Sequence, residues 1–169
     1  MKIIKLETFT KSYVSFVKTT IEDGSFGIGQ MSTYHADITN LIFHKQVAPW
    51  VLNKDYNDFD DLEDFIFERE HKFPGSYLLR AIAGLDTSLW DLKGKLENVP
   101  VVSLIGGSPG KLRVYGSSMK RDILPIDEAE RFNKLFNEKG ISAFKFRIGS
   151  ECGRGQDEWE GRTETIVKT

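Results

Sequence analysis

Two cations lie two residues apart near the end of the chain, in the run 143–149, which reads AFKFRIG. Successive side chains of a β-strand point to opposite faces, so Lys145 and Arg147 share one face and apolar side chains form the other. A strand packed between apolar layers rarely carries a whole face of positive charge. We therefore expect Lys145 and Arg147 to face a polar cavity, where they could hold a carboxylate.

Other polar side chains follow predicted strands. Ser117 closes one predicted strand, and Tyr34 and His35 follow another. Arg154 lies in a charge-rich loop after Arg147. Each of these four residues is a candidate substrate contact, although a strand-end serine or a solvated loop residue has the same appearance in a sequence.

No other motif in the sequence indicates a cofactor site. The three histidines and the single cysteine lack the spacing of a zinc site. The glycines near the third predicted strand do not form the pattern that opens a helix in dinucleotide-binding folds. The acidic stretch 55–64 lacks the glycine of a calcium-binding loop.

The composition is that of a globular protein. Of the 169 residues, 40% are hydrophobic and 28% are charged, which is enough apolar mass for one core. The net charge of −2 argues against nucleic acid as a partner. A single cysteine excludes an internal disulfide and suits a reducing compartment. Neither a signal peptide nor an apolar run of about 20 residues is found, so we expect a cytoplasmic protein without a membrane partner.

The first two thirds of the chain predict a small sheet covered by helices. Strands are expected over 2–9, 13–22 and 26–30, with Asp23-Gly24 as a hairpin turn. Gly27 and Gly29 on one face of the third strand would admit another element at close range. Helices are expected over 37–47, where Pro49 should end the helix, over 58–72 and over 76–97. The last of these has leucines and isoleucines at alternating steps of four and three, ending at Leu96.

The Gly/Pro cluster 106–110 (GGSPG) divides the chain. After it, a strand over 112–117, a helix over 125–139 and a strand over 142–148 predict a parallel βαβ unit. We therefore expect one domain over 1–107 and the start of a second over 108–169.

The run 81–95 (AIAGLDTSLWDLKGK), followed by VPV at 99–101 and LIGG at 104–107, resembles one family. It is similar to the capping-domain helix and linker of the mandelate racemase/muconate lactonizing branch of the enolase superfamily, and the resemblance covers residues 1–149. It implies an α+β N-terminal capping domain, with a three-stranded antiparallel sheet and a helical bundle, over the start of a (β/α) TIM-type barrel. It also implies that three barrel carboxylates bind Mg²⁺, and that this metal stabilises the enediolate formed when the proton α to a carboxylate is removed.

The resemblance assigns roles to several candidate residues. Lys145 and Arg147 match a Lys-x-Lys pair whose second lysine is a base, but arginine stays protonated and serves better as a charge clamp. Arg147 would then stabilise charge, and Lys145 would be its partner or a base that the adjacent cation keeps neutral. Tyr34 and His35 match a loop that selects the substrate.

The implied substrate is a small carboxylate, most simply an acid sugar that undergoes dehydration. Racemisation or epimerisation and cycloisomerisation stay open, and a homo-oligomer is expected for the complete enzyme. A (β/α)₈ barrel needs about 250 residues, whereas about 60 follow Gly107. We therefore expect only the first βαβ unit of the barrel, with the metal ligands downstream and the isolated chain inactive. The alternative is a non-catalytic protein built on the capping domain.

Overall fold

The computed structural model describes residues 2–31, 33–54, 61–118 and 123–146. The chain divides into two compact units, Met1–Pro109 and Gly110–Thr169, and each is described by itself.

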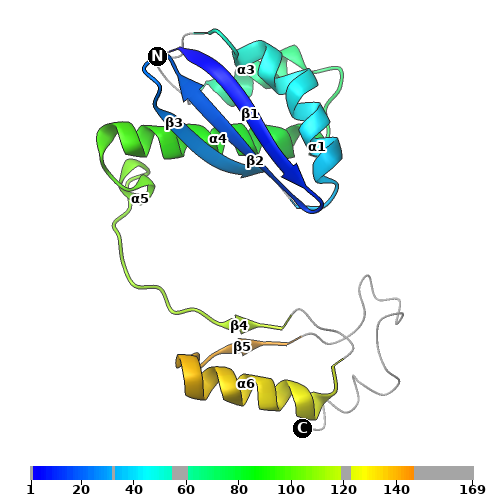
Figure 1. The fold of residues 1–169 in the computed structure, drawn as a ribbon, viewed down its shortest axis with the longest axis vertical. Coiled ribbons are helices and arrows are strands. Elements are labelled where there is room, and N and C mark those ends of the chain that lie inside the picture. The colour runs from blue at the N-terminus through cyan, green and yellow to red at the C-terminus, as the bar shows by residue number, and fades with distance from the viewer. Residues whose placement is uncertain (1, 32, 55–60, 119–122, 147–169) are drawn as a thin grey trace. The chain divides into compact units, whose positions relative to one another are not determined.

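The first unit begins with the predicted three-stranded antiparallel sheet, in the order β1-β2-β3 (Figure 1). Its strands are β1 (Ile3–Lys11), β2 (Val14–Ile21) and β3 (Phe26–Met31). The strand β1 runs two residues beyond the predicted end. Thr10 still pairs with Ser15 there, and their hydroxyl oxygens lie 2.6 Å apart. The turn is therefore Ser12-Tyr13 alone, with Ser12 at φ 47°.

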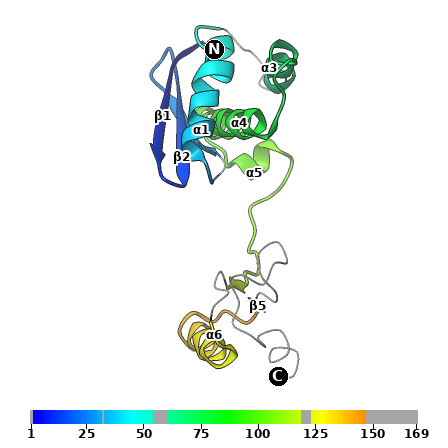
Figure 2. The same cartoon turned by 90° about the vertical axis from the view of Figure 1, so that its right-hand side faces the viewer.

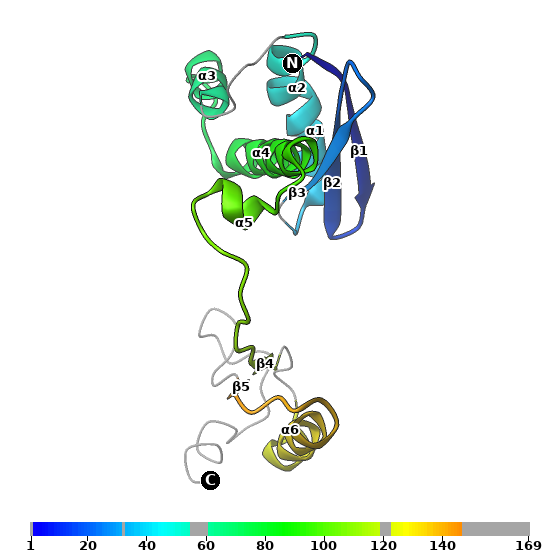
Figure 3. The same ribbon diagram turned by 90° about the vertical axis from the view of Figure 1, so that its left-hand side faces the viewer.

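One long helix, α4 (Ser76–Glu97), covers the inner face of the sheet and has the predicted bounds. Asn98 ends it in the left-handed conformation, at φ 56°. Seen along the sheet, α1 and α4 form a layer against the strands, and α3 lies on the other side of α4 (Figures 2 and 3). The apolar stripe of α4 is buried as far as Leu92, but Leu96 is exposed near the end of the helix.

Two glycines let α4 lie directly on β3, as the sequence predicts. A Cβ atom on Gly29 would be 2.5 Å from the backbone nitrogen of Ser88, and one on Gly27 would be 2.6 Å from that of Leu92. Both distances are far below an ordinary van der Waals contact, so no larger residue fits without moving the helix.

The helix α4 also closes the outer edge of β3. The Asp91 carboxylate accepts a hydrogen bond from the backbone N–H of Ile28, at 2.7 Å. Lys95 donates to the carbonyl of Phe26, at 3.2 Å, and pairs with Asp91, at 2.6 Å. These bonds occupy backbone groups that an edge strand would otherwise offer to another chain.

The prediction that a helix stops before Pro49 is wrong. The segments α1 (Ala36–Ile42), η1 (Phe43–Val47) and α2 (Ala48–Val51) form one continuous helical stretch, and η1 is a π-helical turn. Proline lacks an N–H and its ring crowds the carbonyl four residues earlier. The wide turn directly before Pro49 accommodates the ring, so the helix continues.

The helix α3 (Leu62–Arg69) is shorter than the predicted 58–72. Asp61 precedes it without a side-chain capping bond, and the expected cap Asp58 lies outside the described residues. A further short helix, α5 (Val101–Leu104), follows α4.

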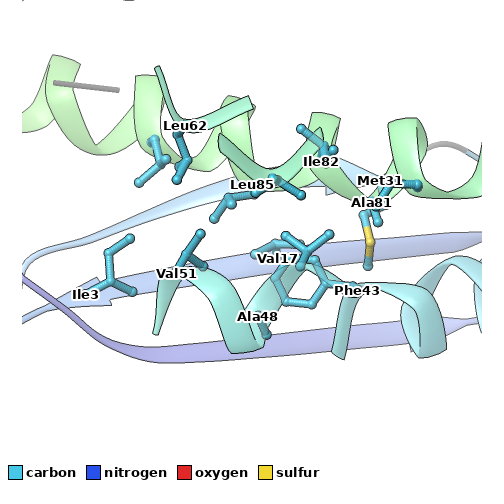
Figure 4. Close-up of a cluster of buried hydrophobic side chains, with 14 of the residues drawn as sticks. Ile3, Val17, Met31, Phe43, Ala48, Val51, Leu62, Ala81, Ile82 and Leu85 are labelled. Carbon is cyan, nitrogen blue, oxygen red and sulfur yellow. The ribbon is translucent and has the colours of Figure 1, made fainter. Parts of the chain in front are cut away.

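The core of the first unit lies between the sheet and the helices (Figure 4). Two polar side chains share it: the hydroxyl oxygens of Thr19 and Ser88 lie 2.6 Å apart, and Ser88 also donates to the carbonyl of Leu85. The fully buried large side chains of this core come from the three strands and from η1, α2, α3 and α4, and are Ile3, Val17, Met31, Phe43, Val47, Val51, Ile66, Leu78, Ile82, Leu85, Leu89 and Leu92.

The second unit contains the predicted βαβ arrangement. The strands β4 (Gly116–Ser117) and β5 (Phe144–Lys145) are parallel, with α6 (Pro125–Lys139) between them in the sequence. Gly140 ends α6 at φ 66°, as predicted. Both strands are shorter than predicted, because ladder pairing among the described residues is limited to these two positions of each strand.

Within the described residues, no helix has both the length and the apolar character needed to span a membrane.

Candidate functional site

The structure brings Lys145 and Ser117 side by side. They are register partners in the parallel pair of β4 and β5, one step beyond the pair Gly116 and Phe144. The backbone N–H of Gly116 donates to the carbonyl of Ala143, at 2.9 Å, and that of Ser118 donates to the carbonyl of Lys145, at 2.8 Å. These bonds fix the register, so a cation and a hydroxyl are neighbours at the carboxyl ends of two parallel strands.

The face on which Lys145 lies follows from its neighbour Phe144. The Phe144 ring stacks on Phe132 of α6, with centroids 4.5 Å apart and planes at 19°. Because side chains alternate, Lys145 leaves the opposite face of β5, and it is exposed. Ser117 is exposed as well. Phe144 thus packs on α6, and Lys145 points away from that helix.

Ser118 differs from Ser117 although the two are adjacent. It is fully buried, and its hydroxyl oxygen has no hydrogen-bond partner among the described residues. By alternation it belongs to the same side as Gly116, where an added Cβ would meet the Phe144 ring at 3.0 Å. Of these two serines, Ser117 is therefore the one that shares a face with Lys145. The other two candidates of this unit, Arg147 and Arg154, lie outside the described residues.

Ligands bind outside the carboxyl ends of parallel strands in α/β folds because the backbone and the following loops converge there. An ammonium beside a hydroxyl at such an end supplies a charge and a hydrogen-bond donor or acceptor. This arrangement can bind a carboxylate or stabilise negative charge that develops on one.

The candidates of the first unit, Tyr34 and His35, lie in the loop between β3 and α1. Both have a positive φ, 66° for Tyr34 and 49° for His35. The Tyr34 ring contacts Tyr13 of the β1–β2 turn edge to face, with centroids 6.2 Å apart. The His35 ring contacts Tyr77 of α4 in the same manner, at 6.3 Å. The two rings of this loop thus lie against one ring of the β1–β2 turn and one ring of α4.

Sequence reasoning missed Tyr13, Tyr77 and Arg80 as members of this group. Arg80 donates to the carbonyl of Thr33, at 3.2 Å. Tyr13 could have been found, because the sequence predicts it at the start of the second strand, next to the short connection that follows the first strand. Tyr77 and Arg80 are far from the loop in sequence and carry no local signal, so only the packing of α4 on the sheet reveals their position.

A pair of carboxyl groups with raised pKa values lies elsewhere in the first unit. Glu63 and Asp86 line a small cavity between α3 and α4, together with apolar side chains that include Leu62 and Leu85. Burial raises the pKa of Glu63, and the nearby charges of Asp86 and Asp64 raise it further. Burial also raises the pKa of Asp86, opposed by its hydrogen bond with Trp90.

Across residues 2–31, 33–54, 61–118 and 123–146, no three histidine, cysteine, aspartate or glutamate side chains are grouped closely enough to hold a metal ion. The described residues therefore do not fit a magnesium site, and we derive no step of a reaction through this metal.

A family model, the N-terminal domain of mandelate racemase and muconate lactonizing enzyme, matches residues 2–106. The chain belongs to this family. The resemblance noted in the sequence is thereby confirmed, and so is the fold class, since the sheet and helices match the capping domain and a short parallel sheet follows.

Two solved structures and one curated relative show how far the similarity reaches. A racemase candidate from Roseobacter denitrificans is 58% identical, with a TM-score of 0.90 over 99% of this chain and 46% of that one. A mandelate racemase/muconate lactonizing protein from Paracoccus denitrificans, complexed with magnesium, is 28% identical, with a TM-score of 0.74 over 89% of this chain and 43% of that one. A D-galactonate dehydratase family member from Pseudarthrobacter chlorophenolicus is 32% identical over 147 residues, or 83% of this chain and 36% of the relative.

The chain spans less than half the length of each of these proteins. The similar proteins include sugar-acid dehydratases, racemases and cycloisomerases of the enolase superfamily, and neighbouring structures carry magnesium or sodium.

Proposed function

We propose that this chain forms the N-terminal part of an enzyme that removes the proton α to a carboxylate of an acid sugar, with dehydration as the outcome. The observation that carries the proposal is the parallel pairing of Ser117 with Lys145, on the face of the strands opposite α6, in a member of this family. The similarity to a D-galactonate dehydratase family member supports an acid sugar as the substrate.

The roles follow from the charges. Removing the α-proton places negative charge on the carboxylate oxygens, and fixed cations beside those oxygens stabilise it. Arg147 stays protonated at ordinary pH, so it acts as a charge clamp and not as the base. Lys145 acts as its partner or as a base, and Ser117 offers a hydrogen bond on the same face. Tyr34, His35 and Arg154 contact the substrate, and Mg²⁺ belongs to the complete enzyme through ligands outside the described residues.

Racemisation is the second candidate, because the Roseobacter denitrificans protein, a racemase candidate, is 58% identical over nearly the whole chain. Both reactions begin with loss of the α-proton. In dehydration the adjacent carbon then loses its hydroxyl group, whereas in racemisation the proton returns to the opposite side of the α-carbon.

A chimera tests the proposal. Residues 1–146 or 1–149 of this chain would be joined to the remaining part of the Roseobacter denitrificans protein, and the product incubated in D₂O with Mg²⁺ and a panel of aldonic and aldaric acids. Dehydration would give a keto acid with deuterium at the carbon next to the new carbonyl group, because the enol takes up a solvent deuteron there. Racemisation would give deuterium at the α-carbon with inverted configuration, and NMR distinguishes the two products. A folded chimera that forms neither product would refute the proposal.

The role of Lys145 has its own control. In the chimera, Lys145→Met should lower the rate of α-proton removal about 100-fold, as expected when one charge-stabilising group is removed. Lys139→Met removes a cation of the same type at the end of α6 and should leave the rate unchanged. Equal rates for the two variants would contradict the role of Lys145. The 169-residue chain alone should show no turnover, and turnover by it would contradict our placement of the metal ligands.

A further inference from the structure

The loop that carries Tyr34 and His35 is strained. Both residues adopt the left-handed conformation, which is unfavourable for residues other than glycine. Two such residues in succession persist only where the surrounding structure holds them. His35 directly precedes α1, but its side chain makes no capping bond to that helix. Helix capping therefore does not explain the conformation.

Contacts from outside the loop account for its shape. Arg80 of α4 donates to the carbonyl of Thr33 at the start of the loop, at 3.2 Å. One turn earlier on the same helix, the Tyr77 ring contacts the His35 ring, with centroids 6.3 Å apart and planes at 73°. At the end of the loop, the backbone N–H of Thr39 donates to the carbonyl of His35, at 3.0 Å. The first two of these interactions come from α4, which is anchored on the sheet by its apolar stripe.

The held loop presents unusually exposed aromatic rings. Tyr34 is 64% exposed, and Tyr13, which contacts it, is 70% exposed. Their edge-to-face contact, with centroids 6.2 Å apart and planes at 77°, joins the β1–β2 turn to the loop and leaves most of both rings open. A ring with an apolar face and a polar hydroxyl suits a ligand that is itself part apolar and part polar, such as a polyol chain.

We propose that Tyr77 and Arg80 are positioning residues that hold the loop 33–35 in its binding conformation before any substrate arrives. The inference rests on the proposed function, which makes Tyr34 and His35 substrate contacts. A loop that is already ordered avoids the entropy cost of ordering on binding. The strain in Tyr34 and His35 is then offset by α4 and not by the ligand.

NMR relaxation of the 169-residue chain, without ligand, tests the proposal. The backbone amides of residues 33–35 should have order parameters near 0.85, the value of rigid backbone. Tyr77→Leu removes the ring and should lower them to below about 0.6. Tyr77→Phe keeps the ring and should restore the wild-type values, together with the ring-to-ring NOE to His35. Arg80→Leu should lower the order parameter of the Thr33 amide more than those of Tyr34 and His35.

Leu79→Ala is the matched control. Leu79 lies between the two positioning residues on α4 and is half exposed. Its truncation should not change the order of the loop, and thermal unfolding of each variant separates local loosening from global destabilisation. A loop already mobile in the wild type, or equally ordered in Tyr77→Leu, would overturn the proposal. These NMR measurements involve no reaction, so their result is independent of whether the chimera removes α-protons.

Discussion

A single methyl group added at Gly29 should strongly destabilise this fold. In Gly29→Ala the new Cβ would lie 2.5 Å from the backbone nitrogen of Ser88, and closer still to the carbonyl oxygen of Gly84. Both atoms belong to the backbone of α4 and cannot rotate away. An ordinary contact begins near 3.4 Å, so α4 must retreat from β3 by about 0.9 Å or more.

The size of the effect follows from what α4 covers. A gap of 0.5–1 Å forfeits roughly a quarter to a half of the dispersion energy between the atoms on its two sides. Leu85 and Leu89 of α4 are almost fully buried in the core, so their packing against the sheet weakens when the helix retreats. We therefore expect the free energy of unfolding to fall by about 3 kcal/mol, the upper end of the range for overpacking. In a unit of this size that lowers the unfolding midpoint by roughly 10–20 °C.

Thermal and urea unfolding followed by far-ultraviolet circular dichroism measures this destabilisation. The control is Gly110→Ala, because a Cβ there would meet no atom within 4 Å. Its stability should stay within about 0.5 kcal/mol of the wild type. If Gly29→Ala unfolded at the wild-type midpoint, our conclusion that α4 packs directly on β3 at Gly29 would be wrong.

Three further substitutions test other contacts. Glu63→Gln should stabilise the protein at pH 7 by a few tenths of a kcal/mol. Burial, with Asp86 nearby, raises the pKa of Glu63 in the folded state, so the stability of the wild type falls as pH rises above about 4. Near pH 3.5 Glu63 is protonated in both states, and urea titrations should show no difference in stability between Glu63→Gln and the wild type. Ser88→Ala should cost about 1–3 kcal/mol by leaving the buried Thr19 hydroxyl unpaired, and adding Thr19→Val should recover part of that cost in the same titrations. Asp91→Ala should speed hydrogen exchange of the Ile28 amide, because the Asp91 carboxylate accepts a hydrogen bond from that N–H. Unchanged exchange would show that α4 does not close the outer edge of β3.

The helices that the sequence predicts best are those whose ends carry local signals. The bounds of α4 follow from an unbroken apolar period and from Asn98, and those of α6 follow from Pro125 and Gly140. Pro49 misleads, because a π-helical turn accommodates it, and that choice depends on the packing of Phe43 and Val47 in the core.

In the candidate site, too, some features follow from local sequence signals and others depend on packing. Alternation along the strand correctly separates Lys145 from Phe144, and the partnership of Lys145 with Ser117 needs only the register of a parallel pair. The order of the 33–35 loop could not be predicted, because it depends on Tyr77 and Arg80, more than 40 residues away in the sequence. The roles of all six candidate residues remain predictions, and Arg147 and Arg154 lie outside the described residues.

The sequence run that identifies the family, 81–95, has a structural role. Gly84 and Ser88 give their backbone to the close approach of β3, and Asp91 binds the edge of that strand. Such residues specify how α4 packs on the sheet, and that packing is compatible with dehydration and racemisation alike. The reaction must therefore be assigned from groups outside this run. Lys145 and the loop held by Tyr77 are such groups, and substitutions there can change activity while leaving the packing of α4 intact.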